Sequence, residues 1–85
     1  LAQLYREQGE FETALLNHAE AIKLLDKIGA KCDLAEAYYQ LGLTYQKMGE
    51  AQKSHKNFDK AIQLFSAMEA PKQVEKVRQA MENGG

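Results

Sequence analysis

Apolar side chains recur at intervals of three and four residues through most of this chain, which is the period of an α-helix. Two such stripes follow each other in the middle of the sequence, over residues 31–48 and 51–69. The first stripe holds Leu34, Tyr38, Leu41, Tyr45 and Met48, and the second holds Phe58, Ala61, Ile62, Phe65 and Met68. We therefore predict two amphipathic helices, each with one buried face.

Glycine marks the ends of the predicted helices. Gly49 lies where the first of them needs a residue with positive φ after its last turn, a position that suits a residue without a Cβ. Gly9 and Gly29 are placed in the same way upstream, and Pro71 suits the first turn of a last helix. The predicted helices cover residues 1–8, 11–28, 31–48, 51–69 and 71–83. This pattern predicts an all-α fold of about five helices.

The chain also repeats itself. When it is shifted so that Leu1 falls on Leu41, nine of the first 30 aligned pairs are identical, and we call this shift the repeat offset. The identical pairs are Leu1/Leu41, Tyr5/Tyr45, Gly9/Gly49, Glu10/Glu50, Asn17/Asn57, Ala21/Ala61, Ile22/Ile62, Leu24/Leu64 and Ala30/Ala70. We expect one domain in which residues 1–29 are the second part of one repeat, 30–70 a complete repeat and 71–85 a capping helix. Because the sequence opens at Leu1 and not at a methionine, we expect it to be a fragment.

Gly42 lies inside the predicted helix over residues 31–48, where glycine costs about 1 kcal/mol relative to alanine. Close approach of a second helix is the usual reason to keep it. Its counterpart in the first repeat is Ala2, and small residues also stand at Ala21 and Ala61. We predict that these small residues allow neighbouring helices to pack closely.

The composition argues against several classes of protein. Eleven basic and 12 acidic side chains give a net charge of −1, without the basic face of a nucleic-acid-binding protein. No apolar run exceeds three residues, so we expect no membrane-spanning helix. The single cysteine, Cys32, cannot form an internal disulfide, which favours a cytoplasmic setting.

The repeated unit resembles the tetratricopeptide repeat (TPR), whose signature is a large residue, Leu-Gly, Tyr, a small residue, an aromatic residue and Ala at fixed offsets. Those places hold Tyr38, Leu41, Gly42, Tyr45, Ser54, Phe58 and Ala61, and the earlier copy matches with Leu1, Ala2, Tyr5, Ala14, His18 and Ala21. The spacing of the two copies exceeds the usual period of about 34 residues, and Asp26 and Ser66 replace the closing proline. The chain is thus most similar to the long-helix variant of this family.

The resemblance implies a right-handed solenoid of helix pairs whose first helices line a concave face. Members of this family typically hold a peptide or a helix of another protein there, so we expect a scaffold or adaptor module of that kind. The groove-facing positions are Glu36, Tyr39, Leu43 and Gln46, with Gln3, Arg6 and Glu7 in the earlier copy and Lys76 and Gln79 on the last helix. An alternative stays open, in which Tyr39 and Leu43 only pack against the neighbouring helix. The carboxylate clamp of the family's best-known subtype is not expected, because Tyr39 and Leu43 occupy its positions.

The sequence gives little support for a catalytic or a metal-binding site. His18 falls on an aromatic core position and is expected to be packed, whereas His55 is expected to face solvent. Cys32 lies near a helix N-terminus without a histidine partner nearby, so a bystander thiol is the simpler interpretation. We expect no enzyme, no cofactor and no metal. The second hypothesis for function is a structural spacer or a self-association element that forms a homo-oligomer through an uncapped N-terminal end.

Overall fold

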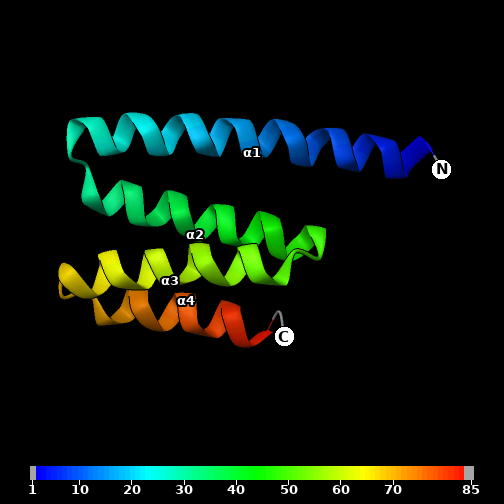
Figure 1. Ribbon diagram of the computed structural model, residues 1–85. Coiled ribbons are helices and arrows are strands. Elements are labelled where there is room, and N and C mark those ends of the chain that lie inside the picture. The colour runs from blue at the N-terminus through cyan, green and yellow to red at the C-terminus, as the bar shows by residue number, and fades with distance from the viewer. Residues whose placement is uncertain (1, 84–85) are drawn as a thin grey trace.

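The computed structural model describes the backbone of residues 2–83 and the side chains of residues 10–82. Within this part the chain is entirely helical apart from short turns. The helices are α1 (Ala2–Ile28), α2 (Lys31–Met48), α3 (Ala51–Ala67) and α4 (Pro71–Asn83). They lie side by side and antiparallel in chain order, so each helix packs against the one that follows it (Figure 1). The all-α prediction is therefore confirmed.

The predicted break at Gly9 is wrong, because α1 continues through this residue and the described part has four helices, not five. Glycine permits the positive φ that ends a helix but does not require it. After Gly49 the chain reverses because α2 and α3 bury a core between them. Among the described residues the substantial contacts of α1 are with α2, so no interface of that kind depends on a turn at Gly9.

The other two glycine turns form as predicted. At Gly49 (φ 81°) the N–H of Glu50 donates to the Tyr45 carbonyl at 2.9 Å, which closes α2 with a Schellman motif. At Gly29 (φ 75°) the N–H of Ala30 donates to the Leu25 carbonyl at 3.0 Å in the same way.

The third turn has the same geometry without a glycine. Glu69 has a φ of 55°, and the N–H of Ala70 donates to the Phe65 carbonyl at 3.0 Å. At the repeat offset, Glu69 stands where the first repeat has Gly29. This turn therefore carries the Cβ strain that glycine avoids in the other two.

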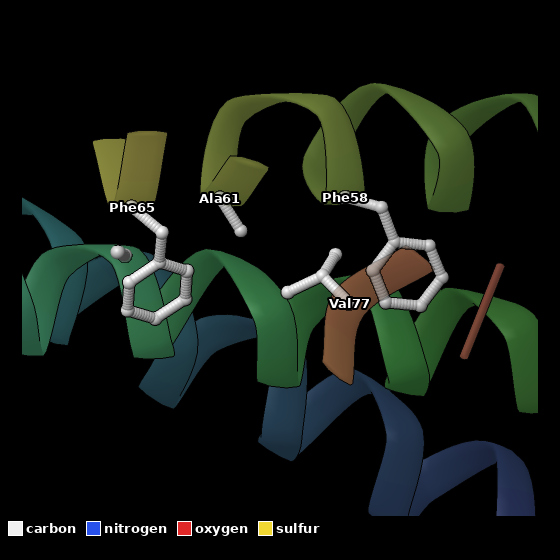
Figure 2. Packing of buried hydrophobic residues seen from close by; sticks show 5 residues of the cluster. Phe58, Ala61, Phe65 and Val77 are labelled. Atoms are coloured by element: carbon white, nitrogen blue, oxygen red, sulfur yellow. The ribbon is translucent and has the colours of Figure 1, made fainter. Parts of the chain in front are cut away.

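The core lies where α2, α3 and α4 meet. It is built from Ala35 of α2, Phe58, Ala61 and Phe65 of α3, and Val77 of α4, all at most 1% exposed. Figure 2 shows Phe58, Ala61 and Phe65 projecting from α3 toward α2, with Val77 between the two phenylalanine side chains. The predicted stripes thus bury their faces against each other. Met48, at the end of α2, is an exception at 36% exposed.

Gly42 allows close packing of α2 and α3, as predicted. A Cβ at this position would lie 2.7 Å from both Cδ1 and Cε1 of Phe58, closer than real Cβ contacts. Next to it, the buried Ser54 hydroxyl donates a hydrogen bond to the Gly42 carbonyl at 2.9 Å. The glycine therefore leaves room for the phenylalanine ring, whose burial offsets its cost in helix propensity. Ala61 is fully buried and Ala21 half-buried, while the side chain of Ala2 lies outside the described residues.

Candidate protein-binding face

Four residues predicted to face the groove lie on one stripe of α2, and three of them contact α4. Glu36 and Tyr39 meet Lys76, and Gln46 meets the backbone at Ala80. The fourth residue, Leu43, is half-buried and packs against the core. We call the surface formed by Glu36, Tyr39, Leu43, Gln46 and Lys76 the α2–α4 face.

Lys76 links the two helices at the centre of this face. Its Nζ lies 3.0 Å from Oε2 of Glu36 and 4.6 Å from the centroid of the Tyr39 ring. The side chains of Lys76 and Glu36 are 40% and 42% exposed, so water and a ligand both reach the pair. An ion pair this exposed is worth at most about 1 kcal/mol, which leaves its atoms available for exchange with a partner's polar groups.

Tyr39 is held from two sides. Its ring lies 6.0 Å from that of Phe58 at an interplanar angle of 44°, and Lys76 covers it from α4. Both tyrosines are half-buried and pack against the core cluster, so the packing contact that the sequence left open for Tyr39 is present. The reason is that α2 has contacts with α1, α3 and α4, so a wider arc of its surface is covered. Tyr39 is thus a pre-positioned aromatic side chain and not a freely rotating one.

Gln46 performs a capping function at the other end of the face. Its Nε2 donates to the Ala80 carbonyl at 2.8 Å. Ala80 lies in the last turn of α4, where backbone carbonyls have no partner within the helix. This hydrogen bond fixes the end of α4 against α2.

The remaining predicted positions divide into two groups. Gln3, Arg6 and Glu7 lie in α1 before Gly9, and their side chains lie outside the described residues. Their part in the face stays a prediction. On α4, Gln79 is exposed.

His18 is half-buried, as predicted, and its Nε2 lies 3.2 Å from Oγ1 of Thr44. The Thr44 hydroxyl donates its only proton to the Gln40 carbonyl at 3.1 Å. His18 must therefore donate from Nε2, and Thr44 accepts. This hydrogen bond joins α1 to α2 and gives the histidine a structural role.

The other side chains considered for chemistry do not gather into a site. Cys32 is a free, exposed thiol in the first turn of α2, and His55 is exposed on α3 as predicted. Among the residues that the structure describes, no three histidine, cysteine or acidic side chains come together as metal ligands. In the same range, no helix is both long and apolar enough to cross a membrane.

The sequence interpretation missed a shallow surface depression that runs from the first half of α3 to the end of α4. Two adjoining hollows of about 410 and 420 Å³ share His55 as a lining residue. We call them together the terminal groove, lined by Ala51, Gln52, His55, Lys56, Arg78, Met81 and Glu82. The sequence contained a sign of it. At the repeat offset, the charged residues Arg78 and Glu82 stand where α2 has Tyr38 and Gly42.

Comparison with known families agrees with this helical arrangement. The family model of the tetratricopeptide repeat matches residues 1–67, which include all of α1, α2 and α3. The chain belongs to the tetratricopeptide repeat family. A search of curated proteins and a search of solved structures each found no match. TPR units generally mediate protein–protein interaction and are generally non-catalytic, so this TPR chain is an interaction module of that general kind.

Proposed function

We propose that this TPR chain binds a peptide or a helix of another protein on its α2–α4 face. The observation that supports this most is the arrangement around Tyr39. An aromatic ring fixed between Phe58 and Lys76 is ordered before a partner arrives, so binding costs little side-chain entropy. Rigid aromatic side chains with a polar end are frequent anchors of protein interfaces.

The face suits an uncharged or mixed segment better than a strongly charged one. Glu36 and Lys76 neutralise each other, so the centre of the face carries little net charge. Leu43 adds apolar surface, while the polar atoms of Gln46 are partly engaged by Ala80. A partner would therefore gain from covering Tyr39 and Leu43 and would exchange hydrogen bonds at the Glu36–Lys76 pair.

A display library of random peptides, selected on the 85-residue chain, tests this proposal. Tyr39→Ala should weaken the best peptide by about 1–3 kcal/mol, which is roughly five- to 150-fold in Kd. Tyr38→Ala is the matched control, because Tyr38 is also half-buried against the core but does not belong to the α2–α4 face. It should change Kd less than twofold. Unchanged affinity for Tyr39→Ala, or equal losses for both variants, would show that the face is wrongly assigned.

A second function, self-association, is favoured by apolar side chains exposed on α1. Leu16, Leu24 and Ile28 are 68%, 63% and 72% exposed. In the second repeat, Leu64 and Met68 stand at the positions of Leu24 and Ile28 and are packed against the core. The same positions in α1 thus lack the cover that α3 has.

Sedimentation equilibrium over a range of concentrations decides this second candidate. A dimer that dissociates in Leu24→Glu would support it, with Ala19→Glu at an exposed position of the same helix as a control for the same added charge. A monomer at every concentration would exclude this function.

A further inference from the structure

The chain contains a second surface, on α2, that corresponds to the terminal groove and shows what such a surface can bind. At the repeat offset, Arg78, Met81 and Glu82 of α4 correspond to Tyr38, Leu41 and Gly42 of α2. On α2, this face is covered by a helix, since α3 packs there with Phe58 against the buried Gly42. The corresponding face of α4 borders an open hollow of about 420 Å³. This hollow therefore lies beside α4 at the position where, beside α2, a helix packs.

The chemistry of the groove differs from that of the corresponding surface on α2. Glu82 replaces Gly42, so a helix cannot approach α4 as closely as α3 approaches α2. On the opposite wall, His55 and Lys56 stand at the positions of Leu15 and Leu16 in the first repeat. An occupant would therefore contact polar ends and the aliphatic stems of long side chains, in place of a tight apolar seam.

The charges that line the groove favour an acidic ligand over a basic one. Lys56 and Arg78 line it with positive charge, against the single carboxylate of Glu82. Both cations belong to exposed residues, and among the described side chains neither forms an ion pair. An acidic ligand could pair with both of them, with Arg78 able to hold a carboxylate through two parallel hydrogen bonds. A basic ligand would meet repulsion from the same two groups.

From this shape and charge, we propose that the terminal groove binds an amphipathic α-helix of another protein that carries acidic residues along its contact face. This surface extends from α3 onto α4 and is lined by none of the residues of the α2–α4 face. The module would then engage partners at two separate sites.

The test uses two synthetic peptides derived from the helix that covers the corresponding surface on α2. One has the sequence of α3, residues 51–67, and the other has the same sequence with Ser54, Asn57 and Ala61, which are buried or half-buried on the contact side of α3, replaced by glutamate. Each is titrated into the ¹⁵N-labelled 85-residue chain, and amide shift changes report both location and Kd. The acidic peptide should shift His55, Arg78 and Met81, and should bind at least fivefold more tightly than the unmodified one.

Two independent variants locate the charge contacts. Arg78→Glu on α4 and Lys56→Glu on α3 should each weaken the acidic peptide at least fivefold. Their matched controls are Lys72→Glu and Lys60→Glu, which make the same change at exposed positions of the same helices outside the groove lining, and which should alter Kd less than twofold. Because the variants lie on different helices, loss of folding in one leaves the other as the test.

Several results would overturn the proposal. The first is equal binding of the two peptides, and the second is the absence of saturable shifts. The third is a set of shifts confined to Tyr39 and Gln46, which would assign the peptide to the α2–α4 face. Self-association of the unmodified chain that Arg78→Glu abolishes would assign the groove to a second copy of the chain and would equally contradict an acidic partner.

Discussion

Replacing Gly42 by alanine sets two opposing effects against each other at the α2–α3 interface. In an unobstructed helix interior this change stabilises by about 1 kcal/mol, because alanine is the better helix former. Here the added Cβ would lie 2.7 Å from two carbons of the Phe58 ring. Phe58 is fully buried, so its ring cannot move toward solvent without losing its own packing. Overpacking of this kind costs about 1–3 kcal/mol, so we expect a net loss of about 1 kcal/mol.

A double-mutant cycle isolates the clash from the gain in helix propensity. In a Phe58→Leu background the ring is gone, and the same Gly42→Ala change should then stabilise by up to about 1 kcal/mol. The interaction between the two sites is thus expected to be about 2 kcal/mol, which exceeds the usual scatter between independent sites.

Urea unfolding followed by circular dichroism at the helical band measures all four proteins of this cycle. A change of about 1 kcal/mol moves the midpoint by roughly 0.3–1 M for a domain of this size. If Gly42→Ala raised stability equally in both backgrounds, Phe58 would not restrict the glycine, and the close approach of α2 and α3 would be refuted.

Three further substitutions test other parts of the structure. Glu69→Gly should raise the free energy of unfolding by about 0.5–1 kcal/mol by relieving a positive φ of 55°, and a fall in the melting temperature would contradict the left-handed turn. Gly9→Ala should also stabilise, by about 0.5–1 kcal/mol, because α1 continues through this residue; destabilisation would indicate that the helix ends there, as the repeat pattern had predicted. Glu36→Gln should cost less than about 1 kcal/mol at low salt and almost nothing at high salt, and a larger loss under both conditions would mean that the pair with Lys76 is buried.

Local chemistry explains why much of the fold was predictable. Gly49 ends α2 because a positive φ there costs nothing without a Cβ, and that requirement can be recognised without coordinates. Gly42 could be predicted for the same reason, since only close packing offsets glycine inside a helix. Gly9 has the same neighbour, Glu10, yet α1 runs on, because reversal depends on how much surface the following helix pair can bury and not on the glycine alone.

The candidate site was predictable in outline and not in detail. Helical spacing alone places Glu36, Tyr39 and Gln46 on one stripe, and it could not reveal that Lys76 and Ala80 would approach them, since that depends on how α4 packs across α2. The terminal groove was missed for a similar reason. A pair such as Arg78 and Glu82 becomes informative only when the structure shows what covers the equivalent positions of α2.

Chemical-shift mapping of a library-selected peptide on the ¹⁵N-labelled chain tests the central claim most directly, because it shows where a partner lies without any substitution. We predict that the largest shifts fall on Tyr39, Leu43, Gln46 and Lys76, which line the α2–α4 face. Shifts that leave these four residues unchanged while the peptide saturates would contradict the claim.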